Sequence, residues 1–182
     1  MKLFFKLSLI TIFLTTFLKA DKVNSFYIGT SNAKIFNETY TELGLGFGTS
    51  GYFDSIIFGL YYNLNYGNIR VENKSKEVST FSTDLKLGYA FLNRDFSVYA
   101  LGAAALQSIG NIDGAGFGYG GGAEYKIAKN FALNFEYKKY DMVSNKEDYD
   151  YEKSNLYLKI IFWNKNNDSF CQKISIKLIK II

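Results

Sequence analysis

Apolar and polar side chains alternate with a period of two across residues 114–137, GAGFGYGGGAEYKIAKNFALNFEY. Phe117 and Tyr125 fall on one face of this pattern, and Glu124 falls on the other. A period of two is typical of a β-strand, because successive side chains point to opposite sides of a sheet. The pattern pauses at residues 128–130 and then resumes with the same two faces. The segment therefore predicts a β-hairpin with one apolar, aromatic face and one small or charged face.

Similar alternation recurs along the chain and predicts eight β-strands in all. We expect them at about residues 23–31, 38–49, 52–65, 78–92, 95–107, 114–127, 131–138 and 151–162. In the fifth segment we assign Tyr99, Leu101, Ala103 and Ala105 to the apolar face, although its alanines also suit a helix. No apolar run after residue 20 reaches the length of a membrane-spanning helix.

The predicted connections alternate in length. Short turns are expected at residues 49–51, 93–94 and 128–130, and longer polar loops at 32–37, 66–77, 108–113 and 141–150. Short turns on one rim and long loops on the other are typical of a bacterial outer-membrane barrel, whose short turns face the periplasm. An even number of strands also places both ends of the sheet on the short-turn rim.

A closed barrel follows from the hydrogen-bonding needs of the backbone in lipid. A bilayer offers no partner for the backbone groups at a strand edge, so a sheet within it must close on itself. Tilted strands of about 9–11 residues are long enough to cross. Aromatic rings suit the interfacial girdles of such a barrel, and we assign to them Tyr40, Tyr52, Tyr62, Phe91, Phe96, Phe131 and Tyr151. The predicted fold class is all-β, an eight-stranded antiparallel transmembrane β-barrel of up-and-down topology, with a soluble β-sandwich as the alternative.

Residues 1–20 have the features of a secretory signal peptide. Early lysines precede an apolar run from Leu7 to Leu18, which is shorter than the roughly 20 residues of a spanning helix. Residues 21–162 form the predicted barrel domain. Residues 163–182 form a tail, and their pattern leaves a strand, a surface-lying helix and a disordered end as alternatives.

Composition and charge exclude several classes of function. Residues 21–162 hold 14 basic and 16 acidic side chains, so no basic stripe indicates nucleic-acid binding. The chain has no His, which excludes Ser-His and Asp-His catalysis, and its single Cys excludes an internal disulfide. We therefore expect no enzyme activity, no cofactor and no metal. Asp148, Asp150 and Glu152 have the chemistry of ligands for a hard cation such as Ca²⁺, but we favour a solvated run of charges.

Charged residues of the predicted strands share the face opposite the apolar one, which would line the lumen of a membrane barrel. An eight-stranded barrel is barely wide enough for its own side chains. We therefore expect opposite charges to pair across the lumen and to block it. The residues assigned to this network are Glu42, Asp84, Lys86, Glu124, Lys126, Glu136, Lys138 and Lys159.

With these features, the chain resembles the small outer-membrane β-barrel family that includes OmpA-like and opacity-type proteins of Gram-negative bacteria. The resemblance covers residues 21–162 and includes the final segment SNLYLKIIF. There Leu156, Leu158, Ile160 and Phe162 are similar to the alternating signal, closed by an aromatic residue, that the outer-membrane assembly machinery reads. The residues after Phe162 depart from the family, since members without a second domain usually end at that aromatic.

The resemblance implies export through a cleaved signal peptide, contact with the barrel assembly machinery during biogenesis, and residence in outer-membrane lipid. We expect a structural or surface-interaction role, adhesin-like or opacity-like, with a host or surface ligand bound at the long loops. Two alternatives stay open. One is a small-solute porin, and the other is a soluble exported barrel that binds an apolar ligand inside and turns its charged residues outward.

Overall fold

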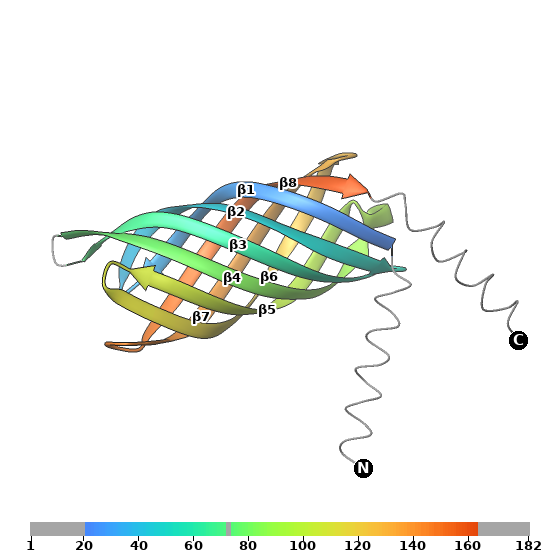
Figure 1. The fold of residues 1–182 in the computed structure, drawn as a ribbon. Coiled ribbons are helices and arrows are strands. Elements are labelled where there is room, and N and C mark those ends of the chain that lie inside the picture. Colours follow the sequence, from blue (N-terminus) through green and yellow to red (C-terminus); the bar gives the residue numbers. More distant parts are fainter. Residues whose placement is uncertain (1–20, 72–73, 164–182) are drawn as a thin grey trace, which may run out of the picture.

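The computed structural model describes residues 21–71 and 74–163 as one closed antiparallel barrel (Figure 1). Its strands are β1 (Asp21–Ile35), β2 (Glu38–Phe53), β3 (Ile56–Val71), β4 (Lys74–Phe91), β5 (Phe96–Ile109), β6 (Ile112–Ala128), β7 (Phe131–Ser144) and β8 (Tyr149–Trp163). Each strand pairs with its neighbours in sequence, and β1 pairs with β8 to close the wall. The predicted eight-stranded up-and-down barrel is therefore confirmed. The signal peptide predicted at residues 1–20, and the predicted tail beyond residue 163, lie outside the described residues.

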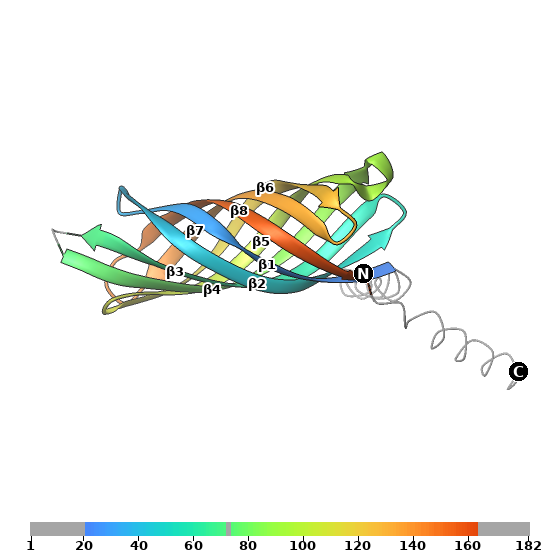
Figure 2. The ribbon, with the colours of Figure 1, turned by 90° about the horizontal axis from the view of Figure 1, so that it is seen from above.

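The barrel has two rims, which we call near and far. The near rim is the one at which the described chain begins and ends, and it carries the β2–β3, β4–β5 and β6–β7 turns. The far rim carries the other connections. Figure 2 shows the β3–β4 hairpin reaching furthest beyond it. Within the described residues, positions 68–71 and 74–77 form strand pairs only with each other, so this end of the hairpin is a free two-stranded ribbon.

The long polar loops predicted on the far rim are wrong, because most of those residues continue the strands. Residues 32–35 pair with residues 38–41, and the chain turns at Phe36 and Asn37 with φ of 50° and 66°. Another tight turn follows Ile109, with Gly110 at φ 57°. Outside lipid, the outward side chains no longer need to be apolar. The alternation is therefore lost there, while the hydrogen-bonded ladder continues.

The turn predicted at residues 49–51 is also wrong. These residues lie within β2, and Gly51 pairs with Phe58 of β3. The chain turns instead at residues 54–55, where Asp54 has a φ of 55°. Small polar residues suit a turn, but here they continue the ladder, and the Ser50 hydroxyl hydrogen-bonds the Tyr61 hydroxyl inside the lumen. The turns predicted near residues 93–94 and 128–130 agree with the structure, the first as the short 3₁₀ segment η1 (Leu92–Arg94).

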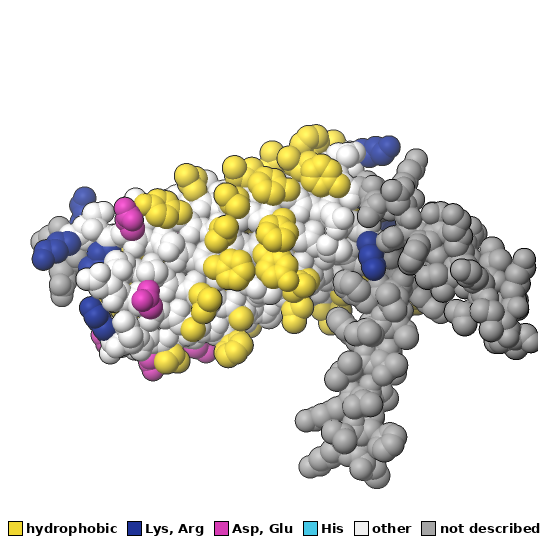
Figure 3. Space-filling model, viewed as in Figure 1, with side chains coloured by type: hydrophobic (Ala, Val, Ile, Leu, Met, Phe, Trp, Pro, Cys, Tyr) yellow, Lys and Arg dark blue, Asp and Glu magenta, His cyan; other side chains and the backbone are white. Residues whose placement is uncertain are grey.

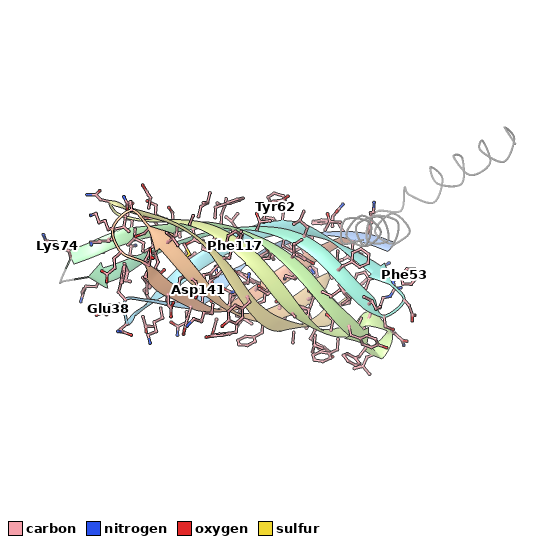
Figure 4. All side chains as sticks on the ribbon, turned by 90° about the horizontal axis from the view of Figure 1, so that it is seen from below. Glu38, Phe53, Tyr62, Lys74, Phe117 and Asp141 are labelled. Carbon is pink, nitrogen blue, oxygen red and sulfur yellow. The ribbon has the colours of Figure 1, made fainter. Side chains whose placement is uncertain are left out.

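Outward-facing side chains form an apolar belt around the wall. Figure 3 shows hydrophobic side chains across the middle of one face, with acidic side chains gathered toward the far rim. In Figure 4, Tyr62 projects from the wall, while Glu38 and Lys74 lie toward the far rim. Phe117 is 80% exposed on the outer face. The exposed apolar set includes Ile28, Leu45, Phe47, Leu64, Phe81, Leu85, Leu106, Phe117, Leu133, Phe135, Leu156 and Leu158. Among the described residues, no helix is long and apolar enough to cross a membrane.

The face assigned to β5 is wrong, since Tyr99, Leu101, Ala103 and Ala105 point into the lumen and are buried. Both faces of this strand are apolar, so alternation could not orient it. The orientation is explained by the Tyr99 hydroxyl, which donates to the Asn134 side chain at 2.7 Å. A buried tyrosine needs such a partner, and lipid offers none.

Three of the tyrosines assigned to the interfacial girdles also point inward. Tyr40, Tyr52 and Tyr151 are at most 7% exposed. Tyr40 and Tyr151 donate their hydroxyls to Glu42. Glu42 therefore supplies an acceptor for two of the inward tyrosines, whereas the Tyr140 hydroxyl is buried without a partner among the described residues.

Glycines on the inner face make room for lumen tyrosines. A Cβ on Gly46 of β2 would lie 2.6 Å from the Tyr27 hydroxyl oxygen, and one on Gly122 of β6 would lie 2.7 Å from that of Tyr99. Both distances are shorter than any ordinary contact. Gly102 differs, because it faces outward and a Cβ there would have nothing within 4 Å.

Candidate functional site

Four of the predicted lumen residues form one continuous chain of ion pairs. Lys86 of β4 pairs with Glu136 of β7, Glu136 pairs with Lys138 at 2.8 Å, and Lys138 pairs with Asp84 of β4. These side chains are at most 5% exposed. Because β4 and β7 are not neighbours in the wall, the chain of charges spans the lumen.

A second ion pair lies beside this chain. Lys159 of β8 contacts Glu124 of β6 at 2.8 Å and donates to the Tyr61 hydroxyl at 3.0 Å. The space among these groups and Lys86 is about 10 Å³. That is roughly the room that one water needs. This part of the lumen is therefore filled by its own side chains.

Neutral groups add hydrogen bonds to the buried carboxylates. Asn63 donates to Asp84 at 2.9 Å, and the Tyr99 hydroxyl donates to Glu136 at 2.9 Å. Lys86 Nζ also lies 4.1 Å from the centre of the Tyr61 ring. Removing a charge from water is costly unless other polar groups replace its hydration. These contacts supply part of that replacement, and Asp84 Oδ1 has no hydrogen-bond partner among the described residues.

Glu42 is held differently from the other lumen carboxylates. It is fully buried, and both Tyr40 and Tyr151 donate hydroxyls to it, at distances of 2.8 to 2.9 Å. No lysine lies within ion-pair distance of it in the part of the chain that the structure describes. Its hydrogen bonds come from tyrosine hydroxyls, and Lys153 attracts it electrostatically without a direct contact.

Lys126 was assigned to the lumen network, but the structure places it elsewhere. It is half-buried near the end of β6, at the near rim, beside Asp95. Sequence reasoning missed Lys153, which is 1% exposed inside the barrel. The signal was present, because Lys153 has the same alternation phase as Asn155 and Lys159 in the final strand. With Lys153 in place of Lys126, the enclosed lysines and carboxylates are equal in number.

Lys153 is enclosed without a hydrogen-bond partner. Its Nζ atom donates a hydrogen bond to no described neighbour, and it lies 5.4 Å from the ring centre of Tyr151 and 6.0 Å from that of Tyr140. The side-chain Nδ2 atoms of Asn65 and Asn155 are also buried without partners among the described residues. Within the part of the chain that the structure describes, the Asp84 Oδ1 atom and the Tyr140 hydroxyl are buried without partners as well.

Two apolar layers enclose the charges. The near collar consists of Val23, Tyr52, Ile57, Ala90, Ala132 and Ile161. The far collar contains Ile35, Ile69, Val78, Ile109 and Met142, each at most 2% exposed. An ion that crossed the barrel would have to pass both collars and the ion pairs between them. The arrangement suits a rigid plug rather than a channel.

This arrangement of side chains is the reverse of what a soluble barrel with an apolar ligand needs. The charges are enclosed and the apolar rings face outward. The candidate cation ligands of the last hairpin are also occupied: Asp150 pairs with Lys139 at 2.8 Å, and Asp148 accepts the Ser144 amide at 3.3 Å. Within residues 21–71 and 74–163, no group of three His, Cys, Asp or Glu side chains could hold a metal ion.

The family to which the sequence belongs indicates the membrane in which this barrel lies. Residues 8–162 match the family described as outer membrane protein beta-barrel domain. The chain belongs to this family. The apolar belt of this outer-membrane barrel is accordingly its lipid-facing surface, and the bacterial outer membrane is its expected location.

Solved structures show the same fold at low sequence identity. Neisserial surface protein A (NspA) is 14% identical with a TM-score of 0.56, over 79% of this chain and 98% of that one. The attachment invasion locus protein Ail of Yersinia pestis, solved with the heparin analogue sucrose octasulfate, is 15% identical with a TM-score of 0.53, over 78% and 99%. The outer membrane enzyme PagL is 14% identical with a TM-score of 0.50, over 76% and 98%. No curated protein matches the sequence.

The residues assigned to the assembly signal lie on the lipid-facing side of β8 in this outer-membrane barrel. Leu156, Leu158 and Phe162 are between 39% and 54% exposed, and Ile160 shares their face. They alternate with enclosed residues such as Tyr157 and Lys159 along the strand that closes the wall against β1. Their recognition by the assembly machinery stays a prediction.

Proposed function

We propose that this protein is a non-conducting outer-membrane barrel with a structural and surface-interaction role, whose far rim faces outward and whose near rim faces the periplasm. The observation that carries the proposal is the filled lumen, in which ion pairs lie between two apolar collars. The orientation is supported by the strand ends at residues 21 and 163, which share one rim as export from the periplasm requires.

Conductance in planar bilayers tests the plug. The unmodified protein should give no steady single-channel current, and its mobility on a gel should change on heating because a closed barrel resists detergent. Ile69→Ser, which makes the far collar polar, should admit more ions than the outward control Leu64→Ser. Large, stable currents from the unmodified protein would favour the small-solute porin instead.

The β3–β4 hairpin suits an anionic surface ligand. Arg70, Lys74 and Lys76 are close in register on its free ribbon. Lys76 pairs with the inward-facing Ile69 and shares its phase with Lys74, whereas Arg70 has the outward phase. The sequence of residues 68–77 also contains Glu72 and Glu77. Other strands of the far rim carry more acids, including Asp141, Asp150 and Glu152. A polyanion would be attracted to the basic hairpin and repelled by the rest of the rim.

Binding of a sulfated probe to cells or proteoliposomes tests this assignment. Sucrose octasulfate should bind the unmodified protein in low salt and dissociate as salt rises. Charge reversal by Arg70→Glu with Lys74→Glu should abolish binding. The matched control Lys34→Glu with Lys139→Glu changes the net charge equally on other hairpins, and equal loss there would show that only net charge matters.

We further infer that the protein has no enzymatic role. Four enclosed carboxylates are occupied by lysine or tyrosine donors, and no His is available as a general base. The likeness to PagL concerns the fold. Incubation of the folded protein with outer-membrane lipids, followed by mass spectrometry, should reveal no new lipid product.

A further inference from the structure

A groove of about 380 Å³ crosses the outer wall near the far rim. Its apolar side is formed by Leu64, Phe81 and Leu106, which pair in register across β3, β4 and β5. These side chains are 40% to 60% exposed and belong to the lipid-facing belt. The volume lies within the range of small-ligand sites, roughly 300 to 1,000 Å³.

The opposite side of the groove is polar and lies two residues closer to the far rim. Ser79, Ser108 and Asp113 pair in register there across β4, β5 and β6. Tyr66 pairs with Ser79 at one end of this row. The two serines have short side chains, so a trough remains between the rows.

This groove coincides with the edge of the apolar belt, where hydrocarbon meets the headgroups. We propose that it binds one glycolipid, with an acyl chain against Leu64, Phe81 and Leu106 and a saccharide headgroup on the polar row. A carboxylate accepts hydrogen bonds from sugar hydroxyls, and charge-assisted bonds are stronger than neutral ones. The exposed ring of Tyr66 offers an apolar surface beside them.

The charge of the site selects the class of headgroup. Asp113 places a carboxylate beside the trough and forms no ion pair among the described residues. Like charges in contact are unfavourable, so a phosphate headgroup is disfavoured there. A neutral sugar supplies donors without that repulsion.

Native mass spectrometry of the folded full chain in detergent tests the site. The probes are a monoglucosyl diacylglycerol, the plain diacylglycerol and phosphatidylglycerol, all with the same acyl chains. The glucosyl lipid should be retained about tenfold better than the other two, the effect of one charge-assisted hydrogen bond. Asp113→Asn should remove that preference, and Ser108→Phe should fill the trough and abolish retention.

Ser154→Phe on β8 is the matched control, because Ser154 is an outward serine away from the groove. It should retain the glucosyl lipid as the unmodified protein does. Equal retention of all three lipids, or equal loss in Ser154→Phe, would overturn the proposal. Heating before electrophoresis confirms folding of each variant, and Asp113→Asn, which preserves side-chain shape, carries the test if Ser108→Phe does not fold.

Discussion

Lys138 and Asp84 form an ion pair across the lumen, although they come from β7 and β4, two strands that share no backbone hydrogen bond. Both side chains are fully buried. Removing one partner leaves the other charge without compensation. Such a change typically costs about 3 to 5 kcal/mol.

Lys138→Met should therefore lower the free energy of unfolding by roughly that amount. Urea titration in detergent or lipid vesicles, followed by circular dichroism, measures the loss. Lys139→Met is the control, because Lys139 is the next residue and pairs with Asp150 on the outer surface. A similar loss in both variants would mean that the buried ion pair contributes no more to the free energy of unfolding than the surface pair does.

Lys153→Met should behave in the opposite way from Lys138→Met. Lys153 is as deeply buried but has no hydrogen-bond partner. Replacing an unsatisfied buried cation by an apolar side chain of similar length removes a desolvation cost. We expect the free energy of unfolding to rise, or to fall by less than about 1 kcal/mol. A loss as large as that of Lys138→Met would indicate that Lys153 has an essential partner.

The lipid-facing belt gives a third prediction. Leu85→Arg and Leu133→Arg place a charge in the apolar wall and should each cost about 2 to 4 kcal/mol of folding into bilayers. The control is Thr41→Arg, which faces outward close to the far rim and should cost far less. The folded fraction in vesicles of defined lipid, read from heat-dependent gel mobility, measures all three. If Thr41→Arg lost as much folding free energy as the two leucine variants, the far rim would lie inside the membrane.

Two glycines make a matched pair for a fourth prediction. Gly46→Ala would press a methyl group into the Tyr27 ring, and overpacking of this kind costs about 1 to 3 kcal/mol. Gly102→Ala adds the same methyl group in open space on the outer face. Since glycine in a strand is destabilising by roughly 0.5 to 1 kcal/mol relative to alanine, the second variant should be neutral or more stable. Urea unfolding distinguishes the two.

Alternation predicted the strands well wherever lipid and lumen impose different demands on the two faces. Phe117 and Glu124 of β6 could be assigned to opposite faces from sequence because one must meet hydrocarbon and the other cannot. The same rule failed for β5, since Leu101 and Ala103 fill the lumen with apolar volume that the lipid would equally accept. Tyr151 was assigned to the wrong side of the wall for a related reason. A tyrosine suits a membrane interface, but it equally suits a lumen in which Glu42 accepts its hydroxyl.

The strand extensions at the far rim and the burial of Lys153 could not be predicted from alternation, for two different reasons. Beyond the membrane the alternation disappears although pairing continues, so residues 32–35 were indistinguishable from a loop. Lys126 and Lys153 both have the inward phase, but only position along the strand decides which one is enclosed. That position depends on the tilt and stagger of the closed barrel, which single-strand patterns do not contain.

The cross-lumen pairs also have a consequence for the order in which the wall can be completed. Asp84 and Lys86 lie in the first half of the chain, and their partners Lys138 and Glu136 lie in β7. Until β7 arrives, those charges have no compensation, so the half-built sheet must keep them in water. A shift of β7 by two residues would keep its apolar side chains facing outward, but it would separate Lys138 from Asp84 and Glu136 from Lys86. The ion pairs therefore favour the native register of β7 over one shifted by two residues, a distinction that burial of its apolar face in lipid does not make.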